Sequence, residues 1–212
     1  MRSSIKAIKK TLTAEQKIAS EFAVIEKIEQ LPQFRSAQNI LLYYSLPDEL
    51  PTVNMLERWS KVKNIYLPRV KGDDLEILRY DEYSLHSGAF NINEPTGNDV
   101  VSPKVPDLVI VPAVAFDKRG NRVGRGKGYY DRLLAGVNAF KIGVCYSFQV
   151  IDDFEPEVHR RNLPLWTGKR YCPLLSVIVV SSNTLSGNDA SMTTAASSPF
   201  PCSSKTLPLI PS

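Results

Sequence analysis

The sequence predicts a single α/β domain of three layers, in which a mixed, mostly parallel sheet is flanked by helices. Apolar runs of strand length alternate along the chain with segments of helical periodicity, and this order is typical of parallel and mixed sheets. The chain has 212 residues, of which 43% are hydrophobic, so it can bury one substantial core. We place the domain at residues 1–182 and a disordered C-terminal tail at 183–212.

The expected helices are marked by apolar spacing and by capping residues. Apolar side chains recur every three or four positions in 3–30, which is the amphipathic helix pattern. The segment Thr13-Ala-Glu-Gln16 has the form of a capping box, so a second helix is expected to begin there. Further helices are expected at 52–61, with Thr52 as the N-cap, and from Tyr129 to Leu134.

The expected strands are short apolar runs bounded by polar or turn residues. Runs that are apolar at nearly every position fit strands buried on both faces. They lie at 39–45, 64–70, 75–80, 107–112 and 141–146, with 174–180 as a further candidate. From about residue 183, Ser, Thr, Pro and Ala dominate, and such a segment buries too little apolar surface to offset its ordering entropy.

Composition narrows the partners and the compartment. The net charge of +4 suits an anionic small molecule and argues only weakly for nucleic acid. Cys145, Cys172 and Cys202 have neither zinc-site spacing nor the density of a disulfide scaffold, which indicates a reducing compartment. No signal peptide or membrane-spanning stretch is apparent. We therefore expect a cytoplasmic monomer that binds small molecules, with no nucleic-acid or membrane partner.

The candidate site is the segment Gly124-Arg125-Gly126-Lys127-Gly128. Glycines let main-chain N–H groups approach an anion closely, and the cations between them neutralise its charge. Arg122 and Arg132 add positive charge on either side. Asp131 is the one carboxylate in this basic cluster, and Mg²⁺ prefers one or two carboxylates together with substrate oxygens. The cluster predicts a site for a magnesium-bound phosphate.

The spacing of this segment excludes the two common nucleotide motifs. A Walker A loop needs a hydroxyl after the lysine, where Gly128 stands, and a dinucleotide loop needs a different glycine spacing directly after a strand. The alternative interpretation is a solvated basic hairpin with no ligand.

The same segment resembles the 5-formyltetrahydrofolate cyclo-ligase family. Residues from Pro112 to Arg132 match the pattern Pro-x-x-x-Phe-Asp-x-x-Gly-x-Arg-Leu-Gly-x-Gly-x-Gly-Tyr-Tyr-Asp-Arg, with Val123 in place of the usual leucine. A second match runs from Tyr43 to Thr52, and the likeness extends from Arg2 to about His159.

The resemblance implies an enzyme that uses ATP and Mg²⁺ to convert 5-formyltetrahydrofolate to 5,10-methenyltetrahydrofolate, releasing ADP and phosphate. It implies Arg125 and Lys127 as catalytic residues and Asp131 as a magnesium ligand. The implied ATP contacts are Arg2, Lys6, Arg122, Val123, Gly124, Arg125, Gly126, Lys127, Gly128, Tyr129 and Tyr130. The implied folate contacts are Tyr44, Glu49, Arg125, Gly126, Lys127, Gly128 and Tyr129.

Each of these residues also has a structural interpretation. Tyr44 fits a core position in an apolar strand, and Glu49 fits an ordinary loop charge. Tyr129 and Tyr130 fit packing at the start of a helix.

The chain departs from the family pattern at both ends of the likeness. The family's ATP-contacting lysine, which precedes its Leu-Arg pair, has no counterpart before Arg2. The segment 160–166 lacks the family's second aspartate, and we hypothesise a shifted reading frame or an altered final exon-like segment after His159. A catalytically impaired homologue that binds nucleotide or folate is therefore an alternative. An RNA- or anion-binding module is a third hypothesis, but it lacks the aromatic platform expected for single strands.

Overall fold

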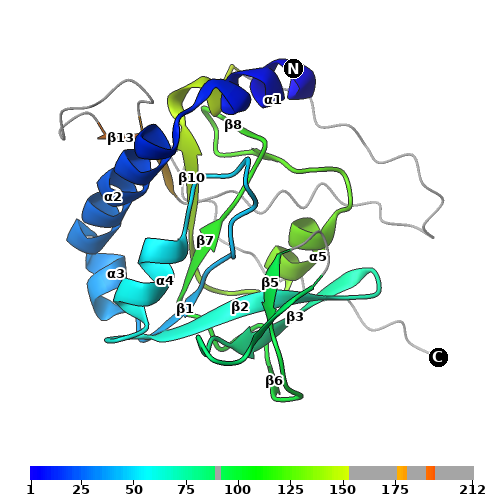
Figure 1. The fold of residues 1–212 in the computed structure, drawn as a ribbon. Helices are drawn as coiled ribbons and strands as arrows, with labels where there is room; N and C mark the ends of the chain where they lie inside the picture. The colour runs from blue at the N-terminus through cyan, green and yellow to red at the C-terminus, as the bar shows by residue number, and fades with distance from the viewer. Residues whose placement is uncertain (89–91, 153–175, 181–189, 194–212) are drawn as a thin grey trace, which may run out of the picture.

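The computed structural model describes residues 1–88, 92–152, 176–180 and 190–193, and it confirms the α/β class. Helices cover both faces of a mixed sheet (Figure 1). The helices are α1 (Arg2–Thr11), α2 (Ala14–Gln30), α3 (Pro32–Ser36), α4 (Val53–Trp59) and α5 (Tyr129–Ala135), with a 3₁₀ turn, η2 (Ser147–Gln149).

The main sheet has eight strands in the order β13-β12-β10-β7-β1-β2-β3-β6. The strands β12, β10, β7, β1 and β2 run parallel, and antiparallel strands close both edges. The bounds are β1 (Asn39–Leu41), β2 (Asn64–Lys71), β3 (Asp74–Arg79), β6 (Val100–Val101), β7 (Leu108–Val111), β10 (Phe140–Tyr146), β12 (Ser176–Val180) and β13 (Ala190–Thr193). Because the five inner strands are parallel, their carboxyl ends lie along one edge of the sheet.

Two smaller sheets lie beside the main one. A hairpin, β4 (Leu85–Ser87) with β5 (Asn93–Pro95), forms one. The other joins β8 (Ala115–Asp117), β9 (Arg122–Val123) and β11 (Val150–Ile151).

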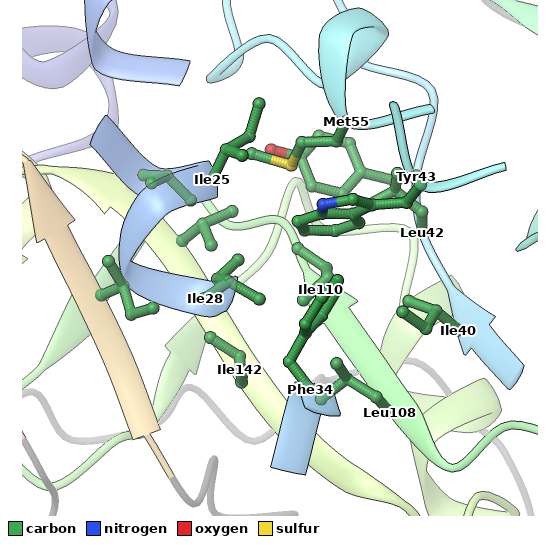
Figure 2. Packing of buried hydrophobic residues seen from close by; sticks show 14 of the residues in the cluster. Ile25, Ile28, Phe34, Ile40, Leu42, Tyr43, Met55, Leu108, Ile110 and Ile142 are labelled. Carbon is green, nitrogen blue, oxygen red and sulfur yellow. The ribbon is translucent and has the colours of Figure 1, made fainter. Parts of the chain in front are cut away.

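The core lies in two layers, because successive side chains of a strand point to opposite faces of the sheet. On one face, Ile40, Ile110 and Ile142 pack against α2, α3 and α4 (Figure 2). On the other face, Val109 and Cys145 pack with buried leucines of α5. All these strand residues are buried, which explains why the parallel strands read as continuous apolar runs.

Helix α1 and the β8–β9 hairpin form a small third cluster above the carboxyl edge. Ile5 of α1 packs with Ala115 and Val123 of the hairpin. The turn between β8 and β9 is held by the buried Asp117 carboxylate, which accepts from the N–H of Arg119 at 2.9 Å and of Asn121 at 2.8 Å. The hairpin was not among the expected strands, since each of its strands is too short to show alternation.

The first expected strand is shorter in the structure than the apolar run that predicted it. The run 39–45 was expected to be a strand throughout, but β1 ends at Leu41. The Leu42 N–H still bonds the Tyr66 carbonyl at 2.9 Å, and beyond it the backbone turns to side-chain partners. The Tyr43 hydroxyl donates to the Leu50 carbonyl at 2.9 Å, which closes the loop after β1 on itself.

The cap of α4 also differs from the expectation. Thr52 occupies the N-cap position, but its hydroxyl donates to the Tyr43 carbonyl at 2.7 Å and does not cap the helix. The buried Glu21 of α2 caps α4 instead, accepting from the N–H groups of Asn54 at 2.8 Å and Met55 at 3.2 Å. A carboxylate from a neighbouring helix therefore satisfies the orphan donors that begin α4. By contrast, the capping box of Thr13 and Gln16 is confirmed.

The C-terminal expectations are only partly covered by the described residues. The strand candidate at 174–180 is confirmed as Ser176–Val180. Within the tail expected to be disordered, Ala190–Thr193 forms β13, which pairs antiparallel with β12 and so covers an edge that would otherwise expose unpaired backbone groups. The rest of 183–212 and the segment 160–166 lie outside the described residues, and the boundary at 182 stays a prediction. Among the helices described, none has the length and apolar character needed to cross a bilayer.

We predict that Glu21→Ala lowers the free energy of unfolding by about 2 kcal/mol, because it leaves two N–H groups at the start of α4 without an acceptor. Urea unfolding measures the change. Glu26→Ala, at an exposed position of the same helix, is the control and should change stability by less than about 0.5 kcal/mol. Equal losses in the two variants would contradict the assigned cap.

Candidate functional site

The candidate site lies at the carboxyl edge of the parallel strands. The loop 42–52 follows β1, and the β8–β9 hairpin follows β7. The segment 124–128 joins β9 to α5 and faces the loop after β1, as its contacts show. This is the edge at which open α/β sheets bind ligands.

The backbone of the segment requires glycine at two positions. Gly126 has φ of 100° and Gly128 has φ of 71°, and both angles lie in the left-handed region that other residues rarely adopt. Gly128 is also the N-cap of α5, so its conformation sets where the helix begins. Arg125 and Lys127 are both exposed. The glycines therefore shape a loop that presents two cations, as the sequence predicted.

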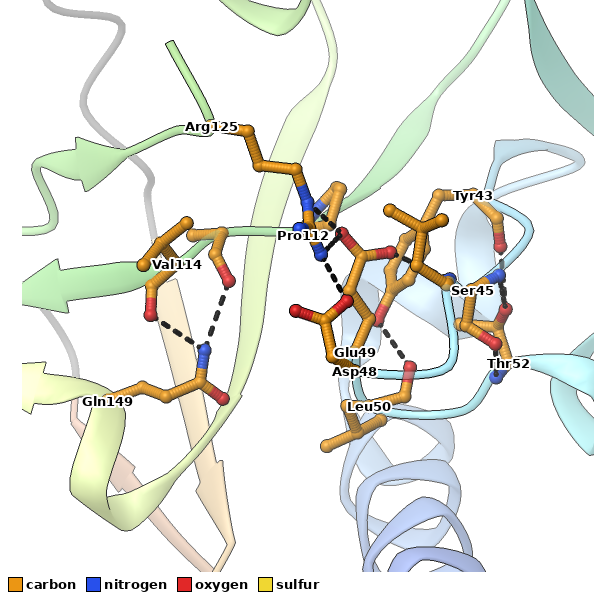
Figure 3. A network of polar contacts seen from close by, with 12 residues as sticks. Tyr43, Ser45, Asp48, Glu49, Leu50, Thr52, Pro112, Val114, Arg125 and Gln149 are labelled. Carbon is orange, nitrogen blue, oxygen red and sulfur yellow. Dashed lines mark hydrogen bonds and ion pairs between the residues drawn. The ribbon is translucent and has the colours of Figure 1, made fainter. Parts of the chain in front are cut away.

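Arg125 joins the segment to the loop after β1 (Figure 3). Its guanidinium lies 2.6 Å from a carboxylate oxygen of Asp48 and 3.1 Å from one of Glu49. Glu49 was an expected substrate contact, whereas Asp48 was not singled out. Burial by itself raises the pKa of Asp48, but the hydrogen bond and the positive charge of Arg125 outweigh it, so the pKa of this carboxyl is lowered.

Glu49 is positioned by its own loop. One carboxylate oxygen accepts from the Leu46 N–H at 3.0 Å, while the other accepts from the guanidinium of Arg125. The Glu49 side chain is only 11% exposed, compared with 34% for Asp48. A carboxylate with both oxygens already bonded to the protein is held in one orientation.

The arginines on either side of the segment are also paired with acids. Arg122 lies 2.6 Å from Asp131, and Arg132 lies 2.8 Å from Asp74 of β3. The Arg122 side chain is 10% exposed, and its guanidinium also donates to the Pro112 carbonyl at 3.3 Å. These pairs join two consecutive residues in the first half of α5, Asp131 and Arg132, to β9 and to β3.

Asp131 can supply one oxygen ligand to a magnesium ion that arrives with a phosphate. Its side chain is 59% exposed, and its present partner is the Arg122 guanidinium. In the described ranges, no group of three or more His, Cys, Asp or Glu residues is placed to hold a metal by itself. The residues therefore fit a metal completed by substrate oxygens and not an all-protein cage, which agrees with how Mg²⁺ is usually bound.

Lys127 differs from the three arginines. Its ammonium has no acidic partner within 4 Å among the residues that the structure describes, and its side chain is exposed. Its backbone carbonyl accepts from the Arg132 guanidinium at 3.3 Å. Lys127 is therefore positioned to meet an incoming anion without first giving up a carboxylate.

The three tyrosines have structural partners of their own. The Tyr129 hydroxyl donates to the Gly72 carbonyl at 3.3 Å, and the Arg132 guanidinium lies over its ring at 5.5 Å. Tyr130 packs against both core layers, and burial together with the charge of Glu49 raises the pKa of its hydroxyl. The Tyr44 hydroxyl accepts from the Asn93 side chain at 3.0 Å. Their assignment as ligand contacts stays a prediction.

The remaining expected contacts lie around the segment. Gly124 leads out of the hairpin, with the guanidinium of Arg122 so close that an added Cβ would lie 3.0 Å from it. Val123 is buried beneath α1, so only its backbone is available to a ligand. Arg2 and Lys6 are exposed on α1, and no ion pair reaches either of them from the described residues.

Besides Asp48, two further residues of the site were not predicted from the sequence. Lys9 of α1 is only 4% exposed and lies close enough to Asp48, Glu49 and Arg125 to feel their charges. Its position four residues after the buried Ile5, on the same helix face, was the available signal. Gln149 of η2 donates to the carbonyls of Ala113 at 3.0 Å and Val114 at 2.9 Å, which fixes the entry to β8 (Figure 3). No sequence pattern indicated this contact.

These features define an α/β protein whose glycine-rich, cationic loop, placed at the carboxyl edge of a parallel sheet, is suited to a polyanionic ligand. A profile of the 5-formyltetrahydrofolate cyclo-ligase family matches residues 1–162. The chain belongs to that family.

Relatives and solved structures agree with this assignment. The chain is 32% identical to a 5-formyltetrahydrofolate cyclo-ligase of Haemophilus influenzae, over 74% of this chain and 89% of the relative. It is 29% identical to the Escherichia coli protein of the same name, over 76% and 93%. Its fold matches an NMR structure of Aquifex aeolicus 5,10-methenyltetrahydrofolate synthetase with a TM-score of 0.74 and 29% identity, covering 94% of this chain and 93% of that one.

We predict that Gly126→Ala weakens binding of inorganic triphosphate at least tenfold, because the loop leaves the left-handed conformation that exposes its cations. Isothermal titration calorimetry measures the affinity. Gly97→Ala is a matched control, since Gly97 also has φ of 100° with open space around its Cβ position. Both variants should lose about 1–2 kcal/mol of stability. Unchanged affinity in Gly126→Ala would contradict the role of the loop.

Proposed function

We propose that this chain converts 5-formyltetrahydrofolate to 5,10-methenyltetrahydrofolate with consumption of ATP. Membership of the cyclo-ligase family supports the reaction class. The observation that carries the proposal is the cationic loop. Lys127 is exposed and has no acidic partner among the described residues, and two carboxylates hold the Arg125 guanidinium beside the loop after β1.

The chemical difficulty of this reaction is that an N-formyl oxygen is a poor leaving group. In the proposed route, the formyl oxygen attacks the γ-phosphorus of ATP and ADP departs. N10 of the folate then attacks the formyl carbon, and the phosphate leaves with that oxygen as N10 loses its proton. The first step needs the γ-phosphate held against the formyl oxygen, which is mainly a matter of positioning and charge stabilisation.

The residues of the loop suit these needs. Lys127 and Arg125 are proposed to neutralise charge on the transferring phosphate, and the N–H groups beside Gly126 and Gly128 to approach its oxygens. When bound, Mg²⁺ would neutralise part of the phosphate charge, and Asp131 is its proposed protein ligand. Exchange of Arg122 from Asp131 to a phosphate would free that carboxylate.

Recognition of the folate is assigned to the loop after β1. Glu49 is proposed to accept hydrogen bonds from polar edges of the pterin, and the ring of Tyr44 to stack on it. Arg2 and Lys6, exposed on α1, are proposed to add long-range attraction for the nucleotide.

The deciding experiment is the formation of methenyltetrahydrofolate, followed by its absorbance, from 5-formyltetrahydrofolate with Mg-ATP. We expect turnover that depends on both ATP and Mg²⁺ and yields ADP in equal amount. Binding of ATP and folate without turnover would instead support the catalytically impaired homologue. Absence of both binding and turnover would refute the proposal.

We predict that Lys127→Ala lowers kcat/KM by about 10- to 100-fold, which corresponds to loss of one charge-assisted bond of about 1.5–3 kcal/mol. The circular dichroism spectrum and melting temperature should stay unchanged, because the Lys127 side chain is exposed. Lys104→Ala, which removes another exposed lysine, is the control. Equal rates in the two variants would remove Lys127 from the mechanism.

A further inference from the structure

Lys9 is a buried cation in a position that the proposed reaction does not yet use. It lies on α1 four residues after Ile5, on the face that packs against the β8–β9 hairpin, and its side chain is 4% exposed. Within the described part of the chain, no hydrogen bond or ion pair within 4 Å reaches its ammonium. Burial lowers the pKa of Lys9, and the nearby carboxylates Asp48 and Glu49 oppose that effect.

The charged groups around Lys9 belong to the candidate site. They come from the loop after β1 (Asp48 and Glu49), from the glycine-rich segment (Arg125) and from β10 (Cys145). Burial raises the pKa of Cys145 to about 12, so this thiol is neutral. Burial and Glu49 raise the pKa values of Tyr43 and Tyr130, so their hydroxyls are neutral as well. The cluster thus balances two cations, Arg125 and Lys9, against two carboxylates.

The balance depends on where Arg125 points. In this structure its guanidinium is shared between Asp48 and Glu49, at 2.6 and 3.1 Å. The same guanidinium is proposed to meet the phosphates of the ligand, so it must give up part or all of those contacts. The two carboxylates are neighbours in one loop. Lys17 of α2 also reaches this loop, where its ammonium donates to the Pro47 carbonyl at 2.9 Å, but apart from Arg125 the cation whose charge acts on Asp48 is Lys9.

We propose that Lys9 is a positioning residue that keeps Asp48 and Glu49 both ionised while Arg125 is engaged by a polyanionic ligand. This inference rests on the proposed function for the identity of the ligand. Two adjacent carboxylates repel each other, and Glu49 is only 11% exposed, so without a nearby cation the uptake of a proton by one of them becomes more favourable. With Lys9 in place, Glu49 remains a full acceptor for the folate throughout the reaction.

The test is the number of protons taken up when the ligand binds. Lys9→Met replaces the ammonium with an apolar side chain of similar length, and it removes a buried charge that makes no direct ion pair with the described residues. Mg-ATP is titrated calorimetrically at pH 6.0 in two buffers of different ionisation enthalpy. We expect Lys9→Met to take up a measurable fraction of a proton more per Mg-ATP bound than the wild type does. The wild-type value corrects for protons that the ligand itself binds or releases.

The same coupling sets how the affinity depends on pH. Between pH 5.5 and 7.5, the Kd of Lys9→Met for Mg-ATP should rise relative to that of the wild type, by at most tenfold per pH unit, because binding consumes a proton. Lys9→Arg restores the charge and should behave as the wild type does. Lys10→Met, which removes the neighbouring exposed lysine, is the matched control. Adding Asp48→Asn to Lys9→Met should abolish the extra proton uptake, since only one carboxylate remains.

Two results would overturn the inference. One is an unchanged proton count in Lys9→Met. The other is weaker binding at every pH without extra proton uptake, which would make Lys9 a direct ligand contact. If the wild type fails to bind Mg-ATP, the proposed function falls, and inorganic triphosphate then serves as the probe for Lys9. If the wild type binds neither, both proposals fall.

Discussion

Arg125 links two loops that have no backbone pairing with each other. One follows β1 and carries Asp48 and Glu49, and the other joins β9 to α5 and carries the three glycines. The ion pair of 2.6 Å sets how far apart these loops lie in this structure. Asp48 and Arg125 keep roughly a third or more of their side-chain surface exposed, so water weakens the pair and an anion can replace either carboxylate. The geometry of the site therefore depends on the ion pair of Arg125 with Asp48, which holds the two loops together but is exposed enough for an anion to compete with the carboxylate.

The sheet explains why these loops face each other. Strands β1 and β7 are parallel neighbours, so the chain leaves both at the same edge. Because β1 has only three residues, a long loop follows it. Backbone carbonyls of this loop accept from side chains and not from a neighbouring strand: Tyr43 donates to Leu50, and Thr52 donates to Tyr43. In the segment that follows β7, Asp117 accepts from the backbone of the β8–β9 turn, and Gln149 donates to a backbone carbonyl at the start of the hairpin. Buried polar side chains thus fix two irregular loops on a rigid parallel core.

Local patterns in the sequence predicted most of the framework, whereas contacts between distant segments had to come from the structure. The capping box at Thr13 and the glycine-rich segment are encoded within a few residues, and both were recognised. Glu21 and Asn54 are 33 residues apart, and Asp48 and Arg125 are 77 apart, so neither pair leaves a spacing signal. Lys9 shows the same limit. Its helical position was apparent, but a lysine on an amphipathic helix is usually solvated, and only the packing of α1 shows that this one is buried.

The pairing of the loop cations with acids also bears on ligand selectivity. An anion that engages Arg125 must compete with two carboxylates, and one that engages Arg122 must compete with Asp131. A small monovalent anion gains too little to displace them. In the proposed function, a triphosphate would first contact Lys127. Its several charges would then attract both Arg122 and Arg125 away from their carboxylates. In the same proposed function, specificity for a polyanion would arise from the acids as much as from the cations, since an unpaired basic loop would bind any phosphate it met.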